Sequence, residues 1–407
     1  MASLSMKIRE KSAGKSSPHK PQTSDVVIIG AGIIGLATAY SLSRIGKSVQ
    51  IIERSKPGVG QSTKTGGGIR LAHGSELNIQ LSQLSLDTWL NFEKHFNIDP
   101  FYRTTGHLFL TTESESALLS QAALLERMKV DCELLTKSQI SSHWPQLSPM
   151  NFSKGLYCNE GGYLDQHRVI KGYVDTVVSN GVKLLTGTQV EGLLKANERI
   201  NGVTTSAGEF HAEWIINAAG PHAGEVADLA GCQIPFVSRH HELLVLEESA
   251  AVPEEIPWLI DTDRQVHMRP DGSGRALIGG FLGRDEATDP NTYDPDLSEG
   301  WSKEVRREAS HSFCITDPES SVLRGWSGLY PGTIDYMPVI DETSPGFITA
   351  AGFSGTGLMH APIVGEIVAD LTMSTKRHLV DISSLSSTRF TNCLLYTSPS
   401  PRDRTRS

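Results

Sequence analysis

Apolar and polar positions between residues 25 and 53 fall into three blocks that predict a strand, a helix and a second strand. The first block, Val26-Val27-Ile28-Ile29, is a continuous apolar run, which is typical of a parallel strand buried on both faces. Glycines follow at positions 30, 32 and 35, then a helical pattern to Arg44, and then the run 49–52 that ends in Glu53. This order predicts a βαβ unit near the start of the fold.

The same interpretation divides the rest of the chain into further elements. Apolar residues recur at helical spacing in 77–96, 115–128 and 167–180, and Asn180-Gly181 is a typical helix stop. Shorter apolar runs predict strands at 106–110, 182–190, 200–205 and 209–218, and a β-rich segment at about 234–281. After an acidic stretch with prolines at 285–302, the chain closes with another strand, glycine-rich turn and helix between 346 and 371.

Two later segments return the chain to the first domain. The buried run 214–220 and the closing unit each end a strand in small residues, where the backbone can lie close to a nucleotide. We therefore predict an α/β (α+β) fold with a discontinuous Rossmann-like domain. This domain is expected to comprise residues 25–105, 155–230 and 325–390. A β-rich substrate domain, 106–154 with 231–324, is expected to be inserted between its pieces.

Three glycines and one acid of the βαβ unit have separate tasks in dinucleotide binding. Gly30 permits the tight turn, Gly32 lets the backbone approach a pyrophosphate, and Gly35 lets helix and strand pack closely. The N-terminus of the helix presents free N–H groups to the phosphate charge. Glu53 can accept hydrogen bonds from both ribose hydroxyls, which favours FAD or NAD over NADP.

Composition and charge narrow the class of protein. The 407 residues are enough for two lobes, and the formal net charge of -9 argues against general nucleic-acid binding. No apolar run approaches the roughly 18 residues that a membrane-spanning helix needs. The five cysteines are scattered without a Cys-x-x-Cys pair, so we expect reduced thiols and no metal site.

The two ends of the chain differ from the rest in composition. Residues 1–24 are lysine- and serine-rich, and we expect a disordered basic tail on a cytoplasmic protein. The alternative is an organellar targeting peptide and a mitochondrial protein. Residues 393–407 have no amphipathic period and resemble a translated sequencing-library adapter, so we expect them to be non-native.

Five motifs in order resemble the D-amino-acid-oxidase/sarcosine-oxidase (DAO) superfamily of FAD enzymes, over about residues 25–390. They are the fingerprint with Glu53, Gly67-Gly68-Ile69-Arg70, Asn217-Ala218-Ala219-Gly220-Pro221-His222, Gly328-Leu329-Tyr330 with Asp335-Tyr336-Met337-Pro338, and Ala351-Gly352-Phe353-Ser354-Gly355-Thr356-Gly357-Leu358-Met359-His360. The most similar branches are the sarcosine oxidase β subunit, proline or dimethylglycine dehydrogenase, and glycine oxidase.

The resemblance implies FAD-dependent oxidation of the C–N bond of a small secondary amine or amino acid, such as sarcosine, proline, dimethylglycine or glycine. A hydride would pass from the carbon beside the amine to flavin N5. The reduced flavin would then pass the electrons to oxygen or to an electron-transfer acceptor. A partner subunit is compatible with this reaction.

The resemblance also implies roles for single residues. Arg70 would bind the substrate carboxylate, with Tyr330 and His267 beside it. The N-terminus of the helix after Gly357 would stabilise negative charge on reduced flavin. The residues expected to bind FAD are Gly30, Ala31, Gly32, Ile33, Gly35, Glu53, Arg54, Ser62, Thr63, Gly67, Gly68, Val190, Ala219, Gly220, Gly328, Gly352, Phe353, Ser354, Gly355, Thr356 and Gly357.

Departures from the family pattern refine these expectations. Gly328 stands where monomeric sarcosine oxidases attach flavin through a cysteine, so we expect non-covalent FAD. Met359 stands where those enzymes carry a lysine, and the lysine that they use toward oxygen has no counterpart near 276–281, which favours a dehydrogenase over an oxidase. An FAD-dependent 2-hydroxy-acid dehydrogenase and a non-catalytic flavoprotein assembly factor remain alternatives.

Overall fold

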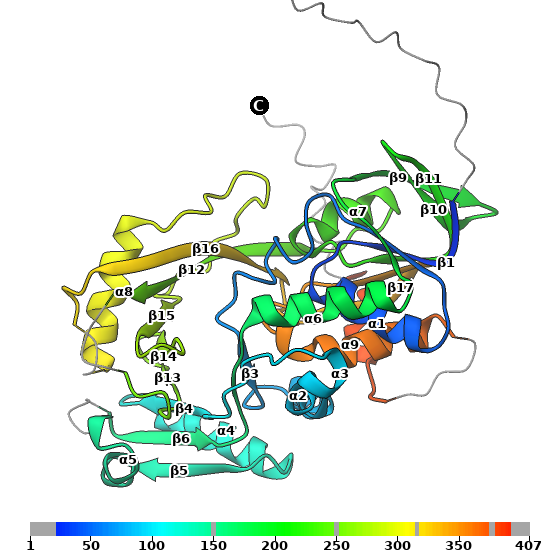
Figure 1. Cartoon of the computed structure of the whole chain (residues 1–407). Helices are drawn as coiled ribbons and strands as arrows, with labels where there is room; N and C mark the ends of the chain where they lie inside the picture. Colours follow the sequence, from blue (N-terminus) through cyan, green and yellow to red (C-terminus); the bar gives the residue numbers. More distant parts are fainter. Residues whose placement is uncertain (1–21, 148–151, 248–251, 314–316, 374–378, 392–407) are drawn as a thin grey trace, which may run out of the picture.

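Two large β-sheets organise the protein (Figure 1), in a computed structural model that describes residues 22–147, 152–247, 252–313, 317–373 and 379–391. The predicted non-native segment 393–407 lies outside the described residues, as do residues 1–21 of the predicted tail. Residues 22–24 contradict the predicted tail, because they form the start of strand β1 (Gln22–Ile29). They pair with residues 210–212 of β11 (Gly208–Asn217), and this pairing extends the strand before the apolar run.

The first sheet has the strand order β17-β18-β11-β1-β2-β8. Its strands from β18 to β8 run parallel, and β17 is antiparallel to β18. The remaining bounds are β2 (Val49–Ile52), β8 (Lys183–Leu185), β9 (Val190–Ala196), β10 (Arg199–Thr205), β17 (Val339–Ser344) and β18 (Phe347–Ala351). Because the strands are parallel, the turns that follow β1, β2, β11 and β18 all lie at one edge of the sheet, where nucleotides bind in such folds.

Helices cover both faces of this sheet. On one face α1 (Ile33–Arg44) packs against α9 (Gly357–Leu371) and α6 (Gln166–Ser179), and Leu36 and Val364 are fully buried there (Figure 1). On the other face, α7 (Ala223–Leu229) covers β11 and β18. The other helices are α2 (Glu76–Leu90), α3 (Phe92–Phe96), α4 (Glu115–Arg127), α5 (Lys137–His143) and α8 (Glu299–Ser312), with short 3-10 turns η1 (Pro145–Leu147), η2 (Gly220–His222), η3 (Ser383–Leu385) and η4 (Ser387–Phe390).

The second sheet has the order β16-β12-β15-β14-β13-β4-β6-β5 and is antiparallel except between β13 and β4. Its strands are β4 (His107–Thr111), β5 (Cys132–Thr136), β6 (Lys154–Cys158), β12 (Phe236–Leu246), β13 (Trp258–Asp261), β14 (Val266–Pro270), β15 (Ala276–Gly280) and β16 (Val322–Thr333). The long strands β12 and β16 run from α8 toward the first sheet (Figure 1). A separate two-stranded ribbon joins β3 (Gly68–Arg70) to β7 (Gly161–Tyr163).

Some predicted elements differ from the structure. The single strand expected at 182–190 is wrong: β8 ends at Leu185, the chain turns at Gly187 with a positive φ of 65°, and β9 begins at Val190. The helix expected over 77–96 is interrupted at Asn91. Sheet pairing also departs from the predicted domain ranges, since β6 and β16 belong to the second sheet although 155–230 and 325–390 were assigned to the nucleotide domain.

None of the helices in the described parts of the chain combines the length and the apolar character that crossing a membrane requires.

Candidate cofactor and substrate site

The turn after β1 is shaped for close approach of backbone to backbone. Gly30 has a φ of 104°, and a Cβ there would lie 2.6 Å from the carbonyl oxygen of Ala218. A Cβ at Gly35 would lie 2.0 Å from the carbonyl oxygen of Gly30. A side chain at either position would therefore displace the strand or the helix. This is why the fingerprint requires glycine at both positions.

The carboxylate of Glu53 is fixed beside this turn. It accepts hydrogen bonds from the amides of Ala31, at 2.8 Å, and Ser55, at 2.7 Å. The hydroxyl of Ser62 accepts a hydrogen bond from the Ile33 amide at 2.9 Å, and so caps α1 from a distant loop. Glu53 is thus oriented at the end of β2, and amides of the first turn of α1 that form no intrahelical bond remain available to an anion.

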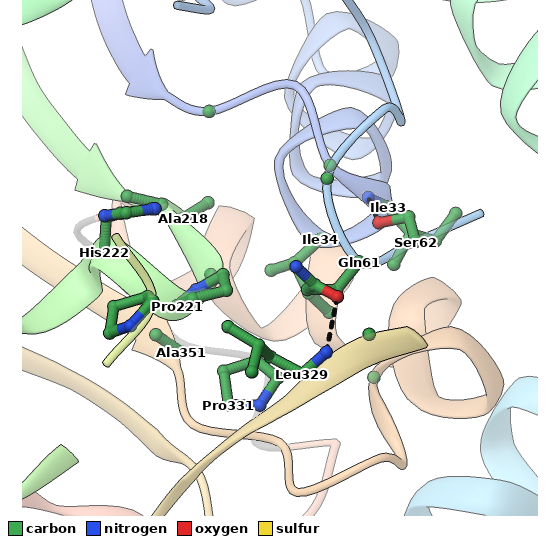
Figure 2. A pocket seen from close by; sticks show the side chains of 18 of the residues that line it. Ile33, Ile34, Gln61, Ser62, Ala218, Pro221, His222, Leu329, Pro331 and Ala351 are labelled. Atoms are coloured by element: carbon green, nitrogen blue, oxygen red, sulfur yellow. Dashed lines mark hydrogen bonds between the residues drawn. The ribbon is translucent and has the colours of Figure 1, made fainter. Parts of the chain in front are cut away.

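A cavity of about 720 Å³ begins at this edge of the first sheet and extends to the second sheet. At one end it is lined by Glu53 and Arg54, and at the other by His267 and Tyr330. Figure 2 shows part of it, with Gln61 and Ser62 facing His222 and Pro221 across the space. The cavity is large enough for a dinucleotide and joins the two predicted domains.

Most of the residues predicted to bind the cofactor line this cavity. They are Gly30, Gly32, Ile33, Glu53, Arg54, Ser62, Val190, Ala219, Gly220, Gly328, Gly352, Phe353, Gly355 and Gly357.

The other predicted residues do not line the cavity, and their local contacts indicate an indirect role. They are Ala31, Gly35, Thr63, Gly67, Gly68, Ser354 and Thr356. The Thr63 hydroxyl donates to the carbonyl of Gly58, and the Thr356 hydroxyl donates to the carbonyl of Phe353. Gly67 has a positive φ of 76°, and a Cβ there would meet the carbonyl oxygen of Leu164. These residues shape the loops that surround the cavity.

The last glycine-rich turn brings α9 to the cavity. Gly355 has a φ of 89°, and a Cβ there would lie 2.6 Å from the ring of Tyr330, so the turn packs directly under this tyrosine. Thr356 precedes α9 without a side-chain cap, and Gly357 and Leu358 of its first turn line the cavity. The uncapped N-terminus places partial positive charge where reduced flavin is expected to lie.

Arg70 lies on β3 at the substrate end but is not among the residues that line the main cavity. Burial lowers the pKa of its guanidinium, while Tyr330 acts in the opposite direction. Its Nε is buried without a hydrogen-bond partner, and the guanidinium makes no ion pair within the described part of the chain. An unpaired cation that is partly withdrawn from water is costly, so this position favours an anionic ligand.

The histidines around Arg70 are neutral. Burial, and then the charge of Arg70, lowers the pKa of His267, His107 and His360 to about 3 in each case. Burial also lowers the pKa of His241 to about 4. Arg70 therefore supplies positive charge among imidazoles that carry none at neutral pH.

Tyr330 and His267 both line the substrate end of the cavity, as predicted. The ring of His241 lies 4.0 Å from the ring of Tyr330, measured between centroids. The ring of His267 covers Gly279, where a Cβ would lie 2.4 Å from it. The structure thus brings two of the three predicted substrate residues to the cavity wall, with the partly buried Arg70 near them.

A second buried arginine has a different task. Arg269 donates from Nε to the carbonyl of Gly66 at 2.8 Å, and its guanidinium lies over the ring of Tyr163 at 4.3 Å. Its exposed fraction is 6%. Because its donors are engaged by backbone carbonyls, Arg269 supports the glycine-rich loop before Arg70 and is less suited to bind a substrate.

The sequence pattern does not indicate a role in the cavity for several of the residues that line it. Lys64 donates to the hydroxyl of Tyr293, and Gln61 contacts the same hydroxyl at 3.3 Å. Gln61 also accepts from the amide of Leu329 at 2.7 Å, the bond drawn in Figure 2. Lys64 is the cavity-lining lysine among the described residues, and only the three-dimensional fold brings its loop to Tyr293 and β16.

A polar chain connects the loop before α8 to the fingerprint end of the cavity. The Nη2 of Arg54 lies 2.7 Å from Nε2 of His222, whose Nδ1 lies 3.1 Å from Glu225. The side-chain Nδ2 of Asn291 donates to the same Glu225 oxygen at 2.9 Å. Since Arg54 can only donate, His222 accepts at Nε2 and donates from Nδ1. The loop is thereby anchored to the first domain.

The comparisons with known proteins agree with this architecture. The chain is 24% identical over 421 residues to hydrogen cyanide synthase subunit HcnC of Pseudomonas aeruginosa, covering 91% of this chain and 97% of that protein. It is 28% identical over 363 residues to sarcosine oxidase subunit beta of Rhizobium meliloti, covering 85% and 84%. The crystal structure of L-proline dehydrogenase from P. horikoshii superposes with a TM-score of 0.81 at 27% identity, covering 92% and 99%.

A family model described as FAD dependent oxidoreductase (DAO) matches residues 25–371, so the chain belongs to this family of oxidoreductases. Its cofactor is therefore FAD. The residues present fit that cofactor: Glu53 is oriented at the adenosine end, small residues line the middle of the cavity, and the uncapped N-terminus of α9 lies at the other end.

Proposed function

We propose that this protein oxidises the C–N bond of a small amine that carries a carboxylate, such as sarcosine, proline, dimethylglycine or glycine. The single observation that carries the proposal is the partly buried guanidinium of Arg70, whose Nε is fully buried and which has no anionic partner in the described part of the chain. The relatives named above include a sarcosine oxidase subunit and a proline dehydrogenase, which supports this substrate class.

The charge of Arg70 acts on both ends of such a substrate. The guanidinium would bind the carboxylate through charge-assisted hydrogen bonds and so fix the amine end beside Tyr330 and His267. The same positive charge disfavours a second cation nearby, so it lowers the pKa of the substrate amine. A neutral amine has the lone pair that C–N oxidation needs.

When bound, FAD supplies the acceptor for the hydride that leaves the carbon beside nitrogen. The chain holds the substrate against it through Arg70 and Tyr330, and stabilises negative charge through the N-terminal amides of α9. Met359, where related enzymes carry a lysine, is buried, and its carbonyl accepts from Trp89 at 2.9 Å. Substrate binding would therefore rest on Arg70 without help from that position.

An anaerobic screen tests this proposal. The FAD-loaded protein would be mixed with sarcosine, proline, dimethylglycine, glycine and the matching amines that lack the carboxylate. We expect the flavin absorbance to bleach with one or more of the amino acids and at least about tenfold less efficiently with its decarboxylated analogue. Equal efficiency with the decarboxylated amine would contradict a role for a carboxylate site.

A further inference from the structure

Two cysteines of the second sheet lie directly opposite each other on neighbouring antiparallel strands. Cys132 on the edge strand β5 is in register with Cys158 on β6. Opposed residues in such a pair point to the same face, with Cα atoms about 4.5–5.5 Å apart, whereas a disulfide needs about 4.4–6.8 Å. Both thiols are free in the structure. The backbone is therefore already arranged for a cross-strand disulfide.

The two thiols are chemically unequal. Cys158 is 1% exposed, while Cys132 is partly exposed at the sheet edge. A hydrogen bond from Cys158 lowers the pKa of the Cys132 thiol, and the same interaction together with burial raises the pKa of Cys158. Cys132 is thus the more accessible and more acidic thiol, with Cys158 in place to react after it.

We propose that Cys132 and Cys158 form a reversible disulfide when the protein meets a hydroperoxide. The Cys132 thiolate attacks the terminal peroxide oxygen, the O–O bond breaks, and the other oxygen leaves as hydroxide or alkoxide, which takes up the proton that the Cys132 thiol released and so becomes water or an alcohol. The sulfur of Cys158 then attacks the resulting sulfenic acid, the S–O bond breaks, and water leaves with the Cys158 proton. Two thiols lose two electrons, and the peroxide gains them.

This pair is connected to the substrate site by a row of side chains across four strands. Cys132, Cys158, His107 and Trp258 stand in register on β5, β6, β4 and β13. The rings of His107 and Trp258 are stacked with centroids 5.6 Å apart. The ring of Trp258 packs against the loop before β3 and against the start of that strand, because a Cβ at Gly66 would lie 2.8 Å from the ring and a Cβ at Gly68 2.9 Å.

The hydrophobic core gives a second connection. Cys158 packs in one cluster with Leu71 and Ala72, the residues that directly follow Arg70, and Cys132 borders the same cluster. A disulfide at this edge therefore changes the packing that supports Arg70. This coupling rests on the proposed function, whereas the disulfide itself does not.

Peptide mapping after mild peroxide treatment tests the disulfide. The FAD-loaded protein would be treated with hydrogen peroxide, its remaining thiols alkylated, and its peptides analysed by mass spectrometry. We expect a peptide pair joining Cys132 to Cys158, lost on reduction with dithiothreitol. Cys158→Ser should leave a sulfenic acid at Cys132 that dimedone traps, and Cys132→Ser should abolish both products. Independent over-oxidation of the two cysteines, or the same products in Cys132→Ser, would overturn the proposal.

Cys232→Ser is the matched control, because Cys232 donates to the carbonyl of Thr343 at 3.2 Å and lies away from the pair. It should form the disulfide as the parent protein does. The coupling predicts that oxidation changes the KM for the amine about fivefold or more, that dithiothreitol restores it, and that Cys132→Ser is insensitive. A disulfide with unchanged KM would overturn the coupling alone. If no amine reduces the flavin, the proposed function fails and the mapped disulfide still stands.

Discussion

Arg70 on β3 and Tyr330 on β16 lie close enough in the interior for each to act on the pKa of the other. Burial raises the pKa of the Tyr330 phenol, and the positive charge of Arg70 opposes that rise. The two residues come from different sheets, and the last glycine-rich turn packs under the tyrosine ring. The guanidinium and the phenol therefore lie close together, and the phenol lines the cofactor cavity.

Replacing Arg70 separates substrate binding from stability. Arg70→Met keeps most of the side-chain volume and removes an unpaired, partly buried charge, so we expect unfolding stability to be unchanged or higher. The kcat/KM for the amine should fall by about 10²-fold, or about 2.7 kcal/mol, because the carboxylate loses its partner. Thermal unfolding and anaerobic flavin reduction measure the two effects.

Arg269→Met is the matched control for this comparison. Arg269 donates to the carbonyls of Gly66 and Pro270, so its loss leaves buried acceptors unsatisfied. We expect it to lower stability by about 1–3 kcal/mol. If Arg70→Met were as destabilising as Arg269→Met while keeping kcat/KM, Arg70 would be a structural arginine.

Glu53→Gln tests the adenosine end of the cavity. The backbone amides of Ala31 and Ser55 donate to the two carboxylate oxygens of Glu53. The glutamine side chain carries no charge and has only one acceptor oxygen, so one of these amides loses its partner. We expect the Kd for FAD to rise about tenfold, or about 1.4 kcal/mol, in a fluorescence titration of the apoprotein. Glu191→Gln, at an exposed carboxylate that also lines the cavity, should change Kd less than about twofold. Equal effects of the two variants would argue against an oriented role for Glu53.

The loop before α8 should control the exchange of FAD. Asn291 does not line the cavity, but its bond to Glu225 anchors the loop across it. Asn291→Ala should therefore raise the rates of FAD release and FAD binding alike. We expect an increase of about three- to tenfold, which corresponds to the free energy of one hydrogen bond. Stopped-flow flavin fluorescence measures both rates. Thr292→Ala, a change at the exposed neighbour, should leave both unchanged, and a change in release alone would exclude control by the loop.

Stability should fall below neutral pH. The pKa of His107, His267 and His360 is lowered to about 3 and that of His241 to about 4, whereas an unfolded histidine titrates near 6.5. As pH falls below about 6.5, the unfolded chain binds protons that the fold excludes, so each of these histidines costs about 1 kcal/mol of stability by pH 5.5. Denaturant unfolding at pH 7.5 and 5.5 measures the loss.

A histidine variant locates this pH dependence. His107→Gln removes one neutral buried imidazole and should reduce the loss between pH 7.5 and 5.5 by about 1 kcal/mol. His143→Gln, at an exposed position, should leave the loss unchanged. A loss that is the same in all three proteins would mean that the buried histidines do not set it.

Local sequence patterns predicted the parts of the site that are formed by residues close together in the sequence. The turn at Gly30, the acid at Glu53 and the turn before α9 each lie within one strand–turn–helix unit, so spacing alone locates them. The pairing of Lys64 with Tyr293 and the register of Cys132 with Cys158 depend on how distant strands pair. Nothing in spacing or composition encodes such pairings, and for the same reason the predicted nucleotide-domain ranges 155–230 and 325–390 include most of β6 and β16, which pair in the second sheet.

The prediction for Arg70 lies between these cases. The motif placed it after a glycine-rich loop, but its lack of an anionic partner appears only when the whole interior is assembled around it. The neutral state of the surrounding histidines likewise follows from burial, which the apolar pattern of single segments does not reveal.

Anaerobic reduction of the bound flavin by an amino acid and by its 2-hydroxy analogue tests the central claim most directly. The two molecules share the carboxylate and differ only in whether nitrogen or oxygen is attached to the carbon beside it. We predict that a small amino acid, such as sarcosine or proline, bleaches the flavin and yields one imine-derived product per flavin, and that the hydroxy acid does not. Bleaching by the hydroxy acid and not by the amino acid would contradict C–N oxidation.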